Sequence, residues 1–189
     1  MRLTDLNALD DGAAAGAFLR CCGSSRWARR MTAARPFADA GAMSAAADAI
    51  WGALGRADWL EAFAAHPTIG AGSPGGAGRA GKAGGAGRAG AAGRRGGTSW
   101  SDEEQAGVAD AGDETRRRLA QANREYEARF GYIFIVCATG RTAAEMLALL
   151  EGRLRHDAGE ELGVAAEEQR QITQLRLRKL LEPEPDALS

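Results

Sequence analysis

The 189-residue chain has little of what several classes of protein require. Its three cysteines, Cys21, Cys22 and Cys137, are an odd number without CxxC spacing, which argues against a disulfide framework and against a cysteine zinc site. No apolar run is long enough to cross a bilayer, and the first residues lack the apolar core of a secretion signal. These absences favour a cytoplasmic protein with reduced thiols.

The chain also lacks a strong charge of either sign. Its formal net charge is -1, so the molecule as a whole makes no case for binding nucleic acid or a membrane surface. Hydrophobic residues make up 45% and charged residues 26%, which is ordinary for a soluble globular protein. The length is sufficient for one domain with a hydrophobic core.

Apolar residues recur at helical spacing through most of the chain, with start and stop signals between the repeats. Asp10 and Gly23 bound one such segment, and Ser44 is a candidate cap for another. Ser101 with Glu104, and Thr142 with Glu145, fit the capping-box pattern. We expect an all-α, single-domain bundle of about seven or eight helices. The segments with helical patterns are 10–23, 24–35, 44–54, 58–66, 101–130, 142–154 and 157–182.

One short segment, 132–138, is typical of a strand. It is apolar throughout and lies between Gly131 and Gly140, so it should be buried. No second strand is available to pair with it. We therefore expect an extended segment among helices and no sheet. Its backbone amides and carbonyls need partners, some of which a bound ligand could supply.

Residues 70–97 are almost entirely Gly, Ala and basic residues. Such a sequence cannot bury enough apolar surface to offset the entropy of ordering, so we expect a disordered insertion over 71–97 within a domain of residues 1–182, followed by a flexible tail, 183–189. The Gly76 to Lys82 spacing resembles a P-loop, but Ala83 lacks the hydroxyl that binds magnesium, and no strand precedes it. A helical binding module that uses this basic loop on nucleic acid or acidic partners is an alternative reading of the chain.

His66 is the first candidate for chemistry. It ends an apolar helical pattern, and Pro67 disfavours further helix. An imidazole titrates near neutral pH, although most histidines at helix ends only cap carbonyls. Other candidates have equally plain alternatives: Ser101 and Glu104 could cap a helix, Gln105 could lie on the surface, and Arg176 could face solvent.

Several ordered pieces together resemble the 2-oxo-4-hydroxy-4-carboxy-5-ureidoimidazoline (OHCU) decarboxylase family, whose members act in urate degradation. They begin with His66-Pro67-Thr68-Ile69-Gly70 and Ser101-Asp102-Glu103-Glu104-Gln105. Asn123, Tyr126 and the segment 130–138 follow in the same order. The tail matches through Arg153-Leu154, Glu161, Ala165, Glu168, Ile172 and Leu175-Arg176-Leu177.

This resemblance implies an all-helical homodimer that needs no cofactor and no metal. Such an enzyme would convert the ureidoimidazoline to (S)-allantoin. The resemblance implies that His66 is the acid/base residue, that Glu104 is its catalytic partner and that Arg176 binds the anionic substrate. The substrate-binding residues that it implies are Pro67, Ser101, Gln105, Phe134, Ile135, Val136, Cys137 and Ala138.

Two departures from the family pattern stand out. The segment between the His-Pro motif and Ser101 is longer than expected because of the Gly-rich insertion, and loop closure costs grow only slowly with such length. His156 stands where the family often has asparagine. We expect His156 to face solvent or cap a helix and not to be catalytic.

Overall fold

The computed structural model describes residues 1–69 and 112–182, which form eight α-helices and no strand within those ranges. The prediction of an all-α fold is therefore confirmed. Ser101, Glu104, Gln105 and the segments 71–97 and 183–189 lie outside the described residues. The helices are α1 (Leu3–Ala8), α2 (Asp11–Cys22), α3 (Ser25–Ala33), α4 (Ala40–Gly52), α5 (Arg56–Ala64), α8 (Asp113–Phe130), α9 (Ala143–Arg153) and α10 (Ala158–Leu181).

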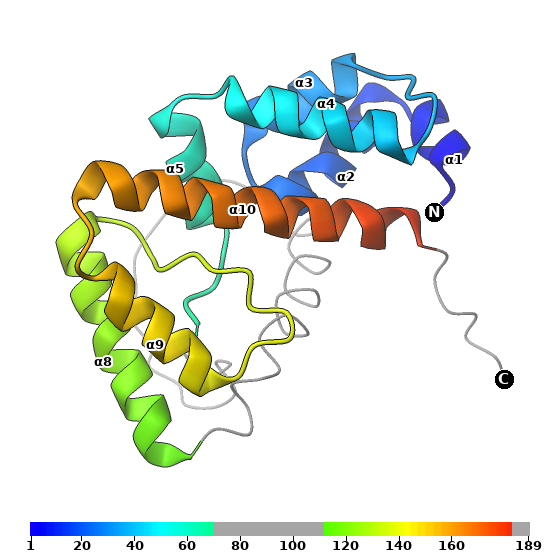
Figure 1. Cartoon of the computed structure of the whole chain (residues 1–189). Coiled ribbons are helices and arrows are strands. Elements are labelled where there is room, and N and C mark those ends of the chain that lie inside the picture. The colour runs from blue at the N-terminus through cyan, green and yellow to red at the C-terminus, as the bar shows by residue number, and fades with distance from the viewer. Residues whose placement is uncertain (70–111, 183–189) are drawn as a thin grey trace, which may run out of the picture.

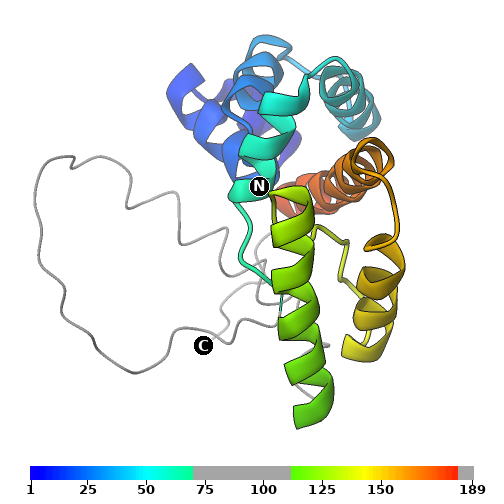
Figure 2. The same ribbon diagram turned by 90° about the vertical axis from the view of Figure 1, so that its left-hand side faces the viewer.

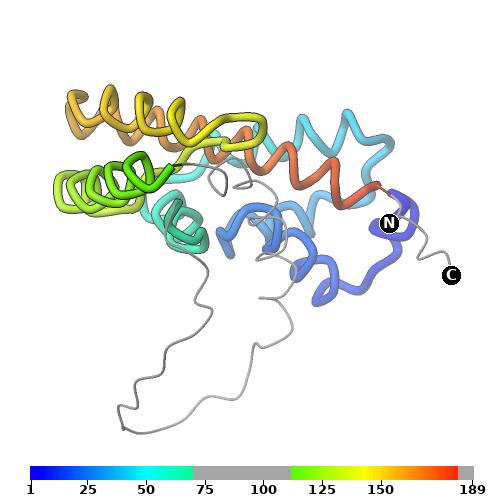
Figure 3. Tube along the Cα trace, turned by 90° about the horizontal axis from the view of Figure 1, so that it is seen from below, coloured from blue at the N-terminus to red at the C-terminus, as the bar shows by residue number. Residues whose placement is uncertain are grey.

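The long helix α10 runs through the middle of the molecule (Figure 1). Helices α2, α4 and α5 pack against it on one side, and α3 packs on α2, α4 and α5. Helices α8 and α9 pair with each other on the other side, and the connection between them follows α10 (Figures 1 and 2). At the far end of α10 the Met1 amino group donates hydrogen bonds of 2.9 Å to the carbonyl oxygens of Leu180 and Glu182 (Figure 3).

Local capping signals locate several helix ends correctly. The Asp10 carboxylate accepts a hydrogen bond of 2.8 Å from the Ala13 amide, and α2 ends at Gly23. Thr142 and Glu145 form the expected capping box at the start of α9. These contacts are made within one turn, so a sequence pattern can contain all their partners.

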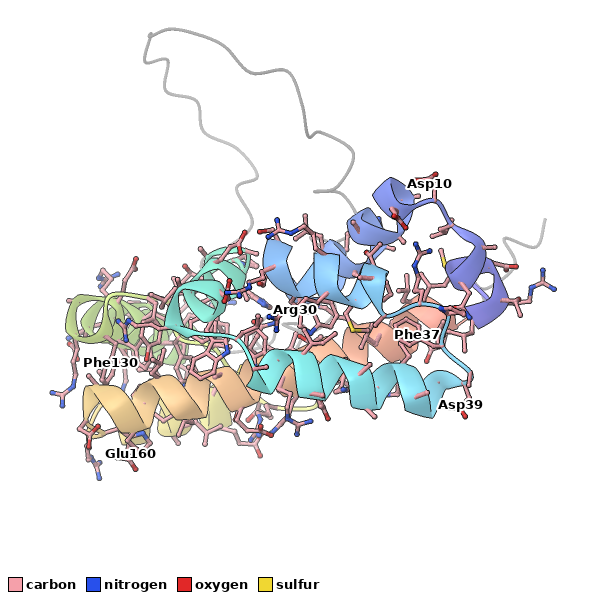
Figure 4. All side chains as sticks on the ribbon, turned by 90° about the horizontal axis from the view of Figure 1, so that it is seen from above. Asp10, Arg30, Phe37, Asp39, Phe130 and Glu160 are labelled. Atoms are coloured by element: carbon pink, nitrogen blue, oxygen red, sulfur yellow. The ribbon has the colours of Figure 1, made fainter. Side chains whose placement is uncertain are left out.

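Three other expectations about helices are wrong. Helix α4 begins after Asp39 and not at Ser44, because the Asp39 carboxylate accepts from the Ala42 amide at 2.7 Å (Figure 4). The Ser44 hydroxyl instead donates to Gln174 of α10. Helix α5 begins at Arg56, so that Asp58 lies in its first turn. The sequence patterns missed α1 altogether.

The turn between α2 and α3 depends on Gly23. This residue has a φ of 84°, which is a left-handed conformation that costs an L side chain about 1–2 kcal/mol. A Cβ atom added to Gly23 would lie 2.6 Å from the Cβ of Ala65 and 3.2 Å from the Ala62 carbonyl oxygen. The end of α2 therefore packs directly against the end of α5, one residue before His66.

We expect Gly23→Ala to destabilise the protein more than Gly131→Ala. Both glycines have similar positive φ values, 84° and 79°, but a Cβ on Gly131 would meet nothing within 4 Å. Gly131→Ala should cost about 1–2 kcal/mol from backbone strain alone, and Gly23→Ala should cost more because of the clash with Ala65. Denaturant unfolding of both variants measures the difference, and equal losses would contradict the close packing of α2 on α5.

Candidate active site

His66 lies just beyond the end of α5, in the connection toward α8. Its backbone amide donates to the Phe63 carbonyl at 3.1 Å, and the exposed Pro67 follows it. Three residues later the Ile69 carbonyl accepts a hydrogen bond of 3.1 Å from the buried Asn123 side chain of α8. The His66–Ile69 segment is thus fixed at both ends, by α5 and by α8.

Helix α10 contributes three buried polar side chains at i, i+4 and i+7: Gln169, Thr173 and Arg176. Only 5% of Arg176 is exposed, so the reading that this arginine faces solvent is wrong. Its positive charge acts on the imidazole of His66 and on the thiols of Cys21 and Cys22. The structure therefore brings His66 and Arg176 together at the end of α2.

The environment of His66 favours the neutral imidazole. Burial, followed by the positive charge of Arg176, lowers the pKa of His66 from 6.5 to about 3, while the neighbouring side chain of Gln169 acts in the opposite direction. The residue as a whole keeps partial exposure, but its Nε2 atom is buried. At neutral pH the ring is uncharged and is able to accept a proton.

The low pKa of His66 predicts a pH dependence of folding. Between about pH 6.5 and pH 3 the unfolded chain binds a proton at this position that the folded chain does not, so stability falls as the pH falls, by at most about 1.4 kcal/mol per pH unit. We expect His66→Asn to lose less stability than the wild type on acidification from about pH 6 to pH 4. Denaturant unfolding across this range tests it, and equal pH slopes for the two proteins would contradict it.

The segment Phe134 to Ala138 runs between α8 and α9 as an irregular buried connection, with Cys137 partly exposed. Side chains supply partners for its backbone. Arg153 Nη1 donates to the Ile135 carbonyl at 2.7 Å, and Glu168 Oε2 accepts from the Cys137 amide at 2.7 Å. Arg141 Nε donates to the Cys137 carbonyl at 3.1 Å. The expectation of a buried segment without a sheet partner is confirmed in this part of the chain.

A buried ionic cluster contacts this segment through Arg153. Its centre is Glu161 of α10, a residue that is 0% exposed. Arg153 donates to Glu161 Oε1 from Nε at 2.8 Å and from Nη2 at 2.5 Å. Tyr126 of α8 donates its hydroxyl to the same oxygen, and burial with this hydrogen bond raises the pKa of Tyr126. The guanidinium of Arg153 also lies 4.7 Å from the ring centroid of Phe134. The cluster joins α8, α9, α10 and the extended segment.

His156 belongs to this cluster, so the expectation that it faces solvent or caps a helix is wrong. Its Nδ1 lies 2.8 Å from Glu161 Oε2, and its side chain is only partly exposed. The start of α10 is capped by Asp157 instead. Sequence patterns could not identify this contact, because a glutamate in the first turn of a helix usually faces solvent.

Of the eleven residues expected in the site, the structure describes eight. His66, Pro67, Arg176 and Phe134 to Ala138 are among them, whereas Ser101, Glu104 and Gln105 are outside the described residues. Sequence reasoning gave no role to Gln169, Glu168, Arg153 or Glu161. The available signal was the placement of polar residues on the apolar face of α10.

The described residues contain no cluster of three or more His, Cys, Asp or Glu side chains that could hold a metal ion. No described helix is both long enough and apolar enough to cross a membrane. Cys21 and Cys22 are fully buried, and burial raises the pKa of both thiols to about 12. These two cysteines are therefore protonated packing residues and poor nucleophiles.

The described residues define an all-helical protein in which a half-buried histidine lies within the electrostatic influence of a buried arginine. A family model for OHCU decarboxylase matches residues 7–178. The chain belongs to the OHCU decarboxylase family.

Curated relatives agree with this assignment. The chain is 36% identical over 169 residues to the uric acid degradation bifunctional protein TTL of Arabidopsis thaliana, a match that covers 89% of this chain and 48% of that protein. It is 36% identical over 86 residues to the OHCU decarboxylase of Amia calva, covering 44% of this chain and 48% of the other. The chain spans about half the length of the curated relatives it matches.

Solved structures support the same fold. A crystal structure of OHCU decarboxylase in the presence of (S)-allantoin is 34% identical, with a TM-score of 0.69, and the match covers 88% of this chain and 97% of that one. A crystal structure of (S)-allantoin synthase has a TM-score of 0.65 at 19% identity, covering 96% of this chain and 54% of that one. The second likeness concerns the fold alone.

Proposed function

We propose that this chain is a cofactor-independent decarboxylase that converts OHCU to (S)-allantoin in urate degradation. The observation that carries the proposal is the pairing of a half-buried His66, whose environment favours the neutral imidazole, with a buried Arg176. A permanent positive charge on a largely buried side chain suits an anionic substrate. An imidazole that is free to accept a proton suits a reaction that begins with a hydroxyl group.

The substrate's own structure explains why no electron-accepting cofactor is required. Its carboxylate and hydroxyl group share one ring carbon, and the neighbouring carbon belongs to an imine. When the bond to the carboxylate breaks, carbon dioxide leaves and the electron pair moves toward the imine. The hydroxyl group loses its proton and becomes the ring carbonyl of allantoin. Two protons complete the product: one is added to the former imine nitrogen, which received the electron pair, and one to the ureido-bearing carbon, where it sets the handedness.

Each polar residue of the proposed site then has a separate role. Arg176 binds and orients the anionic substrate with its fork of donors. His66 accepts the hydroxyl proton, and a substrate anion beside Arg176 would offset the charge that lowers the histidine's pKa. Glu104, as a carboxylate, would stabilise the charged imidazole, as carboxylates do in catalytic triads. Ser101 and Gln105 would hold the substrate's polar edges.

The segment from Phe134 to Ala138 would lie along the heterocycle. Arg153, Glu168 and Arg141 already bind backbone groups of Ile135 and Cys137. In extended backbone, groups of alternate residues point to the same side, so those of Val136 point the other way. No described residue forms a hydrogen bond with the Val136 amide or carbonyl. We assign these two groups to the heterocycle and Pro67 to the wall beside His66.

Two further features complete the proposal. We expect a homodimer in the cytoplasm, as the family resemblance implies. The alternative function, binding of nucleic acid or acidic partners, depends on residues 71–97, which are outside the described part of the chain. No described residue favours it.

The deciding experiment generates OHCU from urate in situ and follows its disappearance and the circular dichroism of the allantoin formed. The expected result is a rate above that of spontaneous decay, with formation of the (S) enantiomer. The purified full chain should be free of added metal and cofactor, with buffer alone as the reference. A rate equal to spontaneous decay, or racemic product, would reject the proposal.

A further inference from the structure

Helix α10 places a fully buried amide, Gln169, beside the site. The side chain is 0% exposed, and its Nε2 donates to the Cys22 carbonyl at 3.3 Å and to the Thr173 hydroxyl oxygen at 3.2 Å. The Thr173 hydroxyl uses its single hydrogen to donate to the Gln169 backbone carbonyl at 2.9 Å. Its oxygen must therefore accept from the amide.

These contacts fix which way the amide points. If the amide were flipped, its oxygen would face the Cys22 carbonyl and a hydroxyl whose hydrogen is already used, and both contacts would be repulsive. The nitrogen must therefore point toward Cys22 and Thr173. The Oε1 atom, which can only accept hydrogen bonds, therefore points away from Cys22 and Thr173.

Gln169 Oε1 and His66 Nε2 are both buried, and neither has a hydrogen-bond partner among the described residues. A buried polar atom without a partner destabilises the fold, so each of these atoms favours a neighbour that can complement it. The two side chains are neighbours: Gln169 binds the carbonyl of Cys22, and the next residue, Gly23, packs on Ala65, which precedes His66. Gln169 also raises the pKa of His66, against the larger effect of burial. An oxygen that can only accept is complementary to Nε2 if that nitrogen carries the hydrogen.

We propose that Gln169 is a positioning residue that keeps the hydrogen of neutral His66 on Nε2 and so reserves Nδ1 for proton transfer. The catalytic consequence rests on the proposed decarboxylase function, but the tautomer itself does not. Cys22 and Thr173 position Gln169, and Gln169 in turn positions the imidazole. In the other neutral tautomer the Nε2 lone pair would face the lone pairs of Oε1, and Nδ1 could not accept a proton.

The wild-type protein provides the first test. The chain has only two histidines, so selective ¹⁵N-histidine labelling gives two sets of ring signals, and a His156→Asn variant assigns them. At neutral pH we expect His66 to be protonated at Nε2 and not at Nδ1. A predominant Nδ1-protonated form would overturn the proposal, whether or not the protein decarboxylates OHCU.

Two substitutions at the same position separate positioning from packing. Gln169→Met and Gln169→Glu both remove the amide N–H that binds Cys22 and Thr173, but only glutamate keeps an acceptor facing His66. We expect Gln169→Glu to retain the Nε2-protonated tautomer and Gln169→Met to lose the preference. We also expect the methionine variant to lose about fivefold in kcat with little change in KM, because the acceptor that favours the reactive tautomer is removed.

Thr173→Val is the matched control. It perturbs the anchoring of the amide and leaves Oε1 in place, so the tautomer of His66 should remain that of the wild type. The same tautomer populations in the methionine and glutamate variants would assign Gln169 a packing role only and overturn the proposal. Both populations are read from the resting protein, so they are independent of whether the decarboxylase assay succeeds.

Discussion

Replacement of His66 with asparagine should lower kcat/KM for OHCU decarboxylation by about 10²–10⁴-fold, which is the usual contribution of a general acid or base. Asparagine keeps a polar side chain but cannot exchange a proton near neutral pH. The loss should fall mainly on kcat, since Arg176 would still bind the anionic substrate. In situ generation of substrate, with initial rates at several concentrations, measures both parameters.

The second histidine of the chain provides the control. His156 contacts Glu161 and lies in the ionic cluster behind the extended segment, so His156→Asn should change kcat/KM by less than His66→Asn at equal folded fraction. Circular dichroism melting fixes the folded fraction for both variants. Full activity in folded His66→Asn would remove His66 from the mechanism and leave the family assignment in place.

The parts of the fold that could be predicted from sequence are those with local causes. The ends of α2 and the capping box of α9 depend on residues within one turn of each other. The start of α4 was ambiguous, because Asp39 and Ser44 are both good caps and only tertiary packing takes Ser44 to Gln174. Helix α1 is six residues long and buries only Leu6, so it carried too little periodicity to identify.

The candidate site likewise has residues that could be identified from the sequence and others that depend on tertiary packing. His66 and Arg176 stood out as residue types, but only the family resemblance related them to each other, because 110 positions separate them in the chain. Helical spacing places Gln169 and Glu161 on the apolar face of α10, but it does not identify what they bind. Their partners, Cys22 for one and Tyr126 and Arg153 for the other, come from other helices. Burial of a polar side chain is a tertiary property.

The Glu161 cluster should dominate the stability of the part of the molecule formed by α8, α9 and the segment that connects them. Arg153→Met leaves the carboxylate of Glu161 buried without its cation, and removal of one partner of a buried pair costs about 3–5 kcal/mol. It also removes the donor to the Ile135 carbonyl. Chemical denaturation of the variant measures the loss. The double variant Arg153→Met/Glu161→Gln should recover part of it, because no uncompensated charge then remains.

The pair Arg118–Glu151 is a matched reference for this measurement. It joins α8 to α9 at 2.6 Å, but its side chains are 56% and 42% exposed, so Arg118→Met should cost less than about 1 kcal/mol. Two arginines with near-equal distances to a carboxylate would then differ several-fold in effect through burial alone. If Arg153→Met cost no more than Arg118→Met, burial would not decide the strength of these two pairs. The cluster could not then be the rigid support of the extended segment.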